Sequence, residues 1–120
     1  ILEKPHKKVS VWGTGKASRE FLYIDDCARA IIMAMEDHND PEPVNIGTGI
    51  EITIKDLVNT IAKKMSYDGE IVWHSEKPDG QPRRCLDTSK AEKLFGFKAK
   101  TDFDKGLQKT IDWFEGAIKC

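Results

Sequence analysis

The chain has 120 residues, 39% of them hydrophobic and 32% charged, a composition ordinary for a soluble globular protein the size of one domain. Its formal net charge is −1 at pH 7, so no overall field would attract nucleic acid or an anionic membrane. No transmembrane run or signal peptide is visible. The 3 cysteines form no Cys-x-x-Cys pair, which indicates reduced thiols in a cytoplasmic protein.

The first third of the chain predicts two extended segments and a helix. Residues 9–12 alternate as a short strand does, and a glycine-containing loop separates them from a second extended segment over 19–24. Asp25 or Asp26 then offers an N-cap for the helix. Its apolar positions recur at helical spacing, and they are Ala28, Ile31, Ile32 and Met35. Further alanines widen this apolar side, so we expect the helix to be well buried before Asp40-Pro41-Glu42-Pro43 breaks it.

The middle of the chain predicts a strand, a helix and another strand. Residues 44–46 predict a short strand that ends in Gly47-Thr48-Gly49. Thr53 with Asp56 approximates a capping box for the most regular helix of the chain. The apolar stripe of this helix consists of Ile54, Leu57, Val58, Ile61, Ala62 and Met65. Residues 70–74 then predict a strand.

The last third predicts two helices. Thr88 or Ser89 caps a short helix that Gly96 ends. Thr101 with Asp104 starts the final helix. The buried face expected for this helix consists of Phe103, Leu107, Ile111, Phe114 and Ile118.

The predicted order of elements is β-β-α-β-α-β-α-α. Alternating strands and helices argue for an α/β arrangement, and we expect residues 1–120 to form a single unit. A strand as short as 44–46 would suit the edge of a larger sheet.

The stretch from Lys77 to Asp87 carries the clearest chemical signal. It places three cations and two carboxylates around a Pro-Asp-Gly-Gln-Pro turn. Proline fixes φ and glycine permits positive φ, so this turn is stiff. A solvated charge run is the usual explanation of such a stretch. Because Arg83 and Arg84 follow a stiff turn, and guanidinium forks match phosphate oxygens, we favour a shaped site for a phosphorylated ligand.

Two glycine motifs resemble nucleotide loops but do not fit them. Gly47-Thr48-Gly49 lies between a strand and a helix, yet a dinucleotide fingerprint needs a third glycine where Ile52 stands. Gly13-Thr14-Gly15-Lys16 would need glycine in place of Ser10 and a hydroxyl residue in place of Ala17 to form a phosphate loop. Both motifs are therefore interpreted as turns.

No acid–base set can be assembled from the sequence. Neither Tyr23 nor Tyr67 has a lysine four residues later, no metal-binding spacing is present, and no metal site is expected. Cys85 has no nearby base and is interpreted as inert. Taken alone, Trp12 and the pair Arg19-Glu20 would be structural. From its residues, the chain binds an anion and does not visibly perform chemistry.

Several segments together resemble a known family. Val11–Gly15, Arg19–Asp26 and Asn45–Gly49 resemble the C-terminal part of extended short-chain dehydrogenase/reductase enzymes that act on nucleotide sugars. The run Lys77–Arg84, followed by Leu86-Asp87, narrows the resemblance to the GDP-L-fucose synthase family. The resemblance covers nearly all of the chain. It implies the C-terminal substrate-binding part of a Rossmann-type fold.

The resemblance implies a function and a set of site residues. Members of this family convert GDP-4-keto-6-deoxymannose to GDP-L-fucose by epimerisation and reduction with NADPH. By resemblance, Trp12, Arg19, Asp79 and Arg84 contact the GDP-sugar substrate. Family members usually carry lysine where this chain has Arg84, so a planar fork replaces a point cation.

The resemblance also implies what lies outside the chain. The family's cofactor loop and catalytic residues precede this region, so we expect NADP to be bound by a missing N-terminal part. We expect the chain alone to be inactive, and the full-length enzyme to be a homodimer. The chain begins with Ile1 rather than methionine, which suggests a processed product or a piece of a longer protein. Two alternatives stay open: another nucleotide-sugar epimerase or dehydratase, and a stand-alone binding or interaction module without catalysis.

Overall fold

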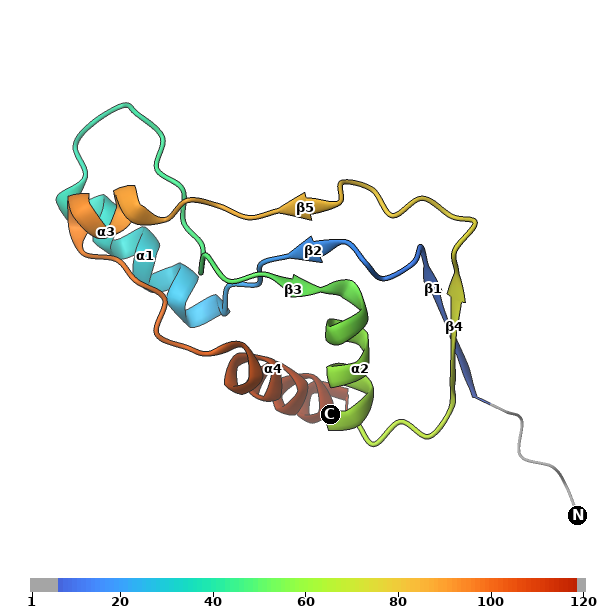
Figure 1. Cartoon of the computed structure of the whole chain (residues 1–120). Helices are drawn as coiled ribbons and strands as arrows, with labels where there is room; N and C mark the ends of the chain where they lie inside the picture. The colour runs from blue at the N-terminus through green and yellow to red at the C-terminus, as the bar shows by residue number, and fades with distance from the viewer. Residues whose placement is uncertain (1–6, 119–120) are drawn as a thin grey trace, which may run out of the picture.

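The structure of the protein is a computed structural model that describes residues 7–118 (Figure 1). The molecule is flat and elongated, with principal extents of 66 × 38 × 19 Å. Its radius of gyration is 18.1 Å, whereas a compact chain of this length would have about 14 Å. So thin a molecule leaves little room for a central core.

Helices and strands alternate along the described residues. In chain order the elements are β1 (Lys8–Trp12), β2 (Ser18–Arg19), α1 (Ile24–Asp37), β3 (Ile52–Thr53), α2 (Ile54–Lys64), β4 (Glu70–His74), β5 (Arg83–Arg84), α3 (Ser89–Phe95) and α4 (Phe103–Ile118). Figure 1 shows α1 and α3 at one end, β1 and β4 at the other, and the short strands β2, β3 and β5 between them. The predicted α/β class is confirmed, as are the strands at 9–12 and 70–74 and all the predicted helices.

The predicted order of strands needs three corrections. Residues 44–46 form no strand, since no described strand pairs with them, and Val44 and Ile46 instead pack against the hydrophobic core. The extended segment predicted over 19–24 forms a ladder only at Ser18–Arg19. Residues 52–53 and 83–84 are strands that local pattern did not reveal, because each is only two residues long.

The strands form two small sheets. β1 pairs in parallel with β4, so that Val11 lies opposite Trp73. In the other sheet β2 lies between β3, to which it is antiparallel, and β5, to which it is parallel. In this second ladder Arg19 lies opposite Arg84. The parallel pairing therefore brings the end of the basic stretch beside residues 18–19.

The core lies where α1 packs on α3. It consists of Ala30, Ala91, Phe95 and Phe97. Asp26 was predicted as a possible N-cap, but it lies inside α1 and is buried. Burial alone would raise the pKa of Asp26, yet hydrogen bonds from Thr101 and Arg29 outweigh burial and lower that pKa below its ordinary value. Asp26 thus ties α1 to the segment before α4.

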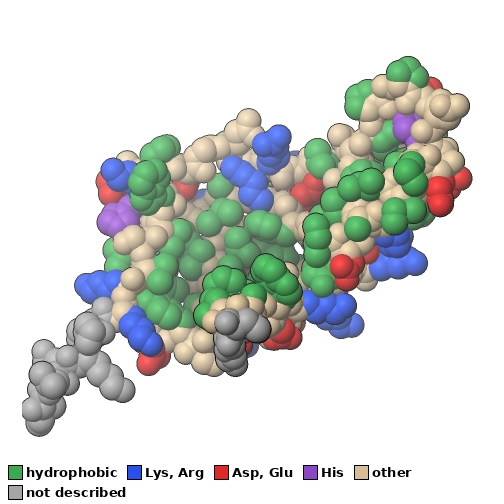
Figure 2. Space-filling view, turned by 180° about the vertical axis from the view of Figure 1, so that it is seen from behind, with side chains coloured by type: hydrophobic (Ala, Val, Ile, Leu, Met, Phe, Trp, Pro, Cys, Tyr) green, Lys and Arg blue, Asp and Glu red, His purple; other side chains and the backbone are tan. Residues whose placement is uncertain are grey.

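The expectation that α1 is well buried is wrong. Ile31, Ile32 and Met35 are 62%, 52% and 76% exposed, because the described elements cover only one side of the helix. In α4, Ile111 is buried as predicted, whereas Phe114 and the following turn are largely exposed. Figure 2 shows hydrophobic side chains gathered on the face of the molecule that points away from the viewer in Figure 1. The chain therefore carries apolar surface that its own described residues do not cover.

One predicted helix cap is confirmed, and two other helix starts differ from the prediction. Thr53 does cap α2, because its Oγ1 accepts from the Asp56 amide at 3.1 Å. Asp87 Oδ1 accepts from the Ser89 amide at 2.9 Å at the start of α3, where Thr88 makes no capping bond. Before α4, Asp102 Oδ1 accepts from the Asp104 amide at 3.1 Å, so Asp102 takes the place predicted for the preceding threonine.

Candidate functional site

The basic stretch is joined to the glycine loop that follows β1. Asp79 Oδ1 accepts from the Thr14 amide at 2.6 Å, and Asp79 Oδ2 accepts from Thr14 Oγ1 at 2.6 Å. Gly13 has a φ of +86°, and a side chain at this position would overlap Asp79. The left-handed glycine therefore turns the Thr14 amide toward the carboxylate. The side-chain and backbone hydrogen bonds from Thr14 lower the pKa of Asp79.

Two arginines lie opposite each other in the ladder near this junction. Arg19 and Arg84 are register partners on parallel strands, so their side chains leave the same face of the sheet. Among residues 7–118, neither forms an ion pair with a carboxylate. Arg83, by contrast, is paired with Glu51. The sheet therefore presents two uncompensated cations on one face.

An open hollow lies beside one of these cations, Arg84. It has a volume of about 480 Å³ and is lined by residues 83–87. Arg19 reaches toward the preceding turn, since its Nη2 lies 3.6 Å from where a side-chain carbon on Gly80 would stand. Space and positive charge thus coincide, which is what an anionic group requires.

Nearby carboxylates hold loops together. Glu20 accepts from the Gly49 amide at 2.8 Å and from the Leu86 amide at 3.3 Å. Glu51 accepts from Ser18 Oγ at 2.7 Å, in addition to its contact with Arg83. Both carboxylates accept hydrogen bonds from other groups of these loops. Among the described residues, neither forms an ion pair with Arg19 or Arg84.

Trp12 stands at the end of β1, next to the glycine loop. Its side chain is 68% exposed, and Lys77 Nζ lies 5.6 Å from the centroid of its ring. An exposed indole beside a cation offers a flat face on which a ring or a sugar could stack. Trp12 therefore suits the wall of a binding site better than the half-buried structural role that its strand position predicts.

The four predicted site residues lie on segments of the chain that contact one another. Trp12 lies two residues before Thr14, which binds Asp79. Gly80 follows Asp79 and lies near Nη2 of Arg19. Arg19 in turn lies opposite Arg84 in the ladder. Sequence reasoning missed Thr14 and dismissed Glu20. The sequence did contain a signal for Thr14, because this residue stands between two glycines. Glycines can adopt positive φ, as both do in the structure, and this exposes the amide between them.

Cys85 lies in the hollow but is not activated. Burial and the charges of Glu20 and Glu51 raise the pKa of its thiol, so the thiol form persists at neutral pH. Across residues 7–118, no group of three or more histidine, cysteine or acidic side chains is arranged to hold a metal ion. The local chemistry is binding by charge and hydrogen bonds.

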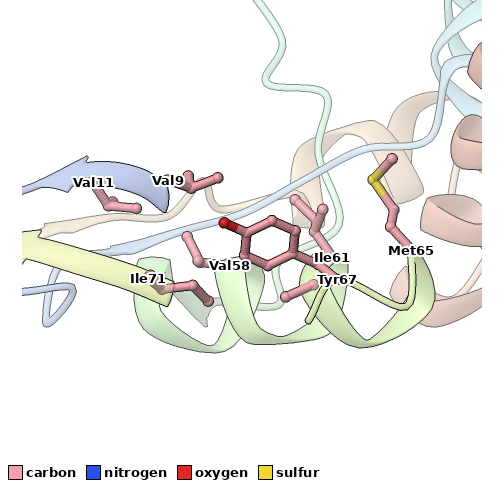
Figure 3. A pocket seen from close by; sticks show the side chains of 8 residues that line it. Val9, Val11, Val58, Ile61, Met65, Tyr67 and Ile71 are labelled. Atoms are coloured by element: carbon pink, nitrogen blue, oxygen red, sulfur yellow. The ribbon is translucent and has the colours of Figure 1, made fainter. Parts of the chain in front are cut away.

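A second hollow lies between α2 and the β1–β4 pair (Figure 3). It has a volume of about 430 Å³ and is lined by Val9, Val11, Val58, Ile61, Ala62, Met65, Tyr67 and Ile71. Its one polar side-chain group, the Tyr67 hydroxyl, donates to the Glu70 carbonyl at 3.3 Å. With no charged group in its lining, this groove does not suit an anion. The loops around the arginine pair are therefore the better candidate site.

In the part of the chain that the structure describes, no helix has the length and apolar character needed to traverse a bilayer.

Comparisons with known proteins show what the chain as a whole is similar to. The family model described as the NAD dependent epimerase/dehydratase family matches residues 1–47. A probable GDP-L-fucose synthase 1 of Oryza sativa subsp. japonica is 43% identical over 107 residues, which are 89% of this chain and 32% of that protein. The GDP-L-fucose synthase of Escherichia coli strain K12 is 40% identical over 115 residues, with 88% and 36% covered. The chain thus spans about a third of the length of the curated relatives it matches.

Solved structures of whole enzymes contain the same fold. A GDP-L-fucose synthetase from Naegleria fowleri bound to NADP superposes with a TM-score of 0.86 at 27% identity, covering 93% of this chain and 36% of that one. A UDP-glucose 4-epimerase from Thermotoga maritima with UDP-glucose superposes with a TM-score of 0.84 at 32% identity, with 93% and 36% covered. The predicted class, an α/β part of a Rossmann-type enzyme, is confirmed. The chain is similar to the NAD dependent epimerase/dehydratase family over residues 1–47, and most of its length is similar to GDP-L-fucose synthases.

Proposed function

We propose that this chain is the GDP-sugar-binding, C-terminal portion of an enzyme like GDP-L-fucose synthase. The observation that carries the proposal is the pair of register-matched cations, Arg19 and Arg84, which no described carboxylate neutralises. Two guanidinium groups on one face can bind a diphosphate through several charge-assisted hydrogen bonds. In the complete protein the activity would be epimerisation and NADPH-dependent reduction of GDP-4-keto-6-deoxymannose.

The proposed roles are binding roles. Arg19 and Arg84 neutralise the diphosphate, and the exposed ring of Trp12 walls the pocket. These contacts position the sugar by binding energy, while proton and hydride transfer fall to groups outside this chain. By the same resemblance we propose that the complete protein is a homodimer, which sedimentation velocity would test.

The Gly47-Thr48-Gly49 loop does not fit the pyrophosphate of the cofactor NADP. The Gly47-Thr48-Gly49 loop is where a dinucleotide loop would lie, but the Glu20 carboxylate accepts from its Gly49 amide and packs directly against Gly47. A carboxylate in this position would repel a pyrophosphate. We therefore propose that NADP binds outside residues 7–118 and that the isolated chain does not oxidise NADPH. Turnover by the purified chain above a blank would overturn this.

The arginine pair suits any nucleoside diphosphate sugar, so the base is a separate question. A UDP-glucose 4-epimerase is among the structural relatives, which makes a UDP-sugar the second candidate. Titrating the complete protein with GDP, UDP and dTDP separates the candidates by affinity. A stand-alone binding module is the other alternative. A cofactor loop and Tyr-x-x-x-Lys motif upstream in the same reading frame would exclude that alternative.

The decisive test is calorimetric titration of the complete protein with GDP. We expect Arg84→Ala to weaken GDP binding about tenfold to a hundredfold, since a hydrogen bond to a charged group contributes roughly 1.5–3 kcal/mol. The control is Lys105→Ala, which removes one positive charge from an exposed position on α4, outside the residues that line the hollow. An unchanged affinity in Arg84→Ala, or an equal loss in the control, would contradict the proposed site.

A further inference from the structure

We propose that Asp79 is a positioning residue, which with Thr14 clamps the basic turn to the glycine loop and so sets where Arg84 lies. This inference rests on the proposed function and deepens it. It gives Asp79 a different role from the direct contact with the GDP-sugar that the family resemblance implies. It also adds Thr14 to the site.

The clamp is bidentate and spans a long stretch of chain. The two carboxylate oxygens of Asp79 accept from the backbone amide and the hydroxyl of the same residue, each at 2.6 Å. Thr14 Oγ1 is itself fixed, because it accepts from the Lys16 amide at 3.3 Å. Two bonds to one residue fix a side chain in direction as well as in distance, and bonds to an ionised acceptor are the stronger kind. The clamp thus orders two exposed loops that are 65 residues apart in sequence.

The charge of Asp79 also argues against contact with a diphosphate. A carboxylate touching phosphate oxygens would repel them, whereas one that accepts two hydrogen bonds from Thr14 has its charge compensated away from the ligand. The pKa of an aspartate is ordinarily far below 7, and Thr14 lowers that of Asp79 further, so this carboxylate is ionised at neutral pH. The clamp is therefore present under the conditions in which a nucleotide would bind.

The clamp reaches Arg84 through a short connection. At its far end the turn is held by the Ser18 amide, which donates to the Pro82 carbonyl at 3.0 Å. Two residues later Arg84 pairs in register with Arg19. With β5 only two residues long, Asp79 is what fixes the near end of the turn. Release of Asp79 should therefore let Arg84 sample more positions and weaken its contact with the ligand.

A double-mutant cycle on the complete protein tests this inference. GDP affinity is measured by calorimetry for Asp79→Ala, Thr14→Ala and the double variant. Thr14→Ser serves as the matched control that keeps both donors. We expect each alanine variant to weaken binding about twofold to tenfold, and the double variant to lose little more than Asp79→Ala alone. Thr14→Ser should bind GDP like the wild type.

Two results would overturn the proposal. If Asp79→Ala weakens binding while Thr14→Ala does not, the bond from the Thr14 hydroxyl does not help to position Arg84, and the proposed bidentate clamp fails. If the two losses add fully, Asp79 does not act through Thr14. Thermal unfolding of each variant checks that the fold is retained.

A second readout separates this inference from the proposed function. In carboxyl-detected NMR, the pKa of Asp79 should lie below its ordinary value and return toward that value in Thr14→Ala. A normal pKa in the wild type, or no change in Thr14→Ala, refutes the clamp even if GDP binds. If the wild type does not bind GDP, the proposed function fails, and the NMR titration alone decides whether the clamp exists.

Discussion

Asp26 is the buried charged residue on which the packing of α1 against the C-terminal segment depends. Its Oδ2 accepts from the backbone amides of Lys100 and Thr101 at 3.1 and 2.8 Å, and its Oδ1 accepts from Arg29 at 3.1 Å. Asp26→Ala would leave the backbone amides of Lys100 and Thr101 without this acceptor, whereas Arg29 would keep its hydrogen bond to the Lys98 carbonyl. Hydrogen bonds to charged groups contribute roughly 1.5–3 kcal/mol each and do not add fully, so we expect a loss of about 2–4 kcal/mol in unfolding free energy.

Urea unfolding of the chain, followed by circular dichroism, measures this loss. The matched control is Asp25→Ala, which removes an exposed carboxylate from the same first turn of α1. The control should cost no more than about 1 kcal/mol, the size of a helix-dipole contribution. Equal costs for the two variants would refute the role assigned to Asp26.

The pH dependence of the same measurement has a definite sign. Because the pKa of Asp26 is lowered in the folded state, its contribution is fully present above the unfolded pKa of about 3.9 and is lost as the pH falls through the folded value. The difference in stability between the wild type and Asp26→Asn should therefore shrink as the pH falls below about 4. A difference that grows on acidification would contradict the hydrogen-bonded carboxylate.

Two further predictions concern backbone strain and exposed apolar surface. Gly13→Ala should destabilise the chain by about 1–3 kcal/mol in urea unfolding, because φ is +86° and the new carbon would overlap Asp79. Gly116→Ala is the control; it has nothing within 4 Å inside α4 and should stabilise by about 0.5–1 kcal/mol, so a stabilising Gly13→Ala would contradict the reasoning. The isolated chain should self-associate through the apolar side of α1, where Ile31 and Ile32 are exposed. Ile31→Glu with Ile32→Glu should shift its sedimentation toward the monomer, and a wild type that stays monomeric at all concentrations would sink this prediction.

Local sequence sufficed for the elements whose causes are local. The apolar stripe of α2 and its Thr53–Asp56 cap lie within one segment, so spacing alone predicted that helix. Gly96 ends α3 in the left-handed conformation, as a glycine after a helical run predicts. The Lys77–Arg84 run likewise predicted the family resemblance, whereas the phosphorylated ligand that it indicates stays a prediction.

What depends on distant partners could not be predicted in this way. Residues 44–46 have the composition of a strand, but a strand also needs a neighbour, and the described residues supply none. The sequence predicted Asp26 as a possible N-cap, yet it lies inside α1, and its partners Lys100 and Thr101 come more than 70 residues later in the chain. The burial predicted for α1 failed for the same reason, because helical periodicity identifies an apolar side without saying what covers it.

The site shows the same division. The sequence by itself determined that a stiff turn leads into two adjacent arginines, and that the chain has no overall charge to attract an anion. Only the tertiary structure decided that Glu51 neutralises Arg83, while Arg84 lies opposite Arg19 without a described acidic partner. Neighbours in sequence point to opposite faces of a strand, so strand pairing separates two residues that sequence alone treats as equivalent.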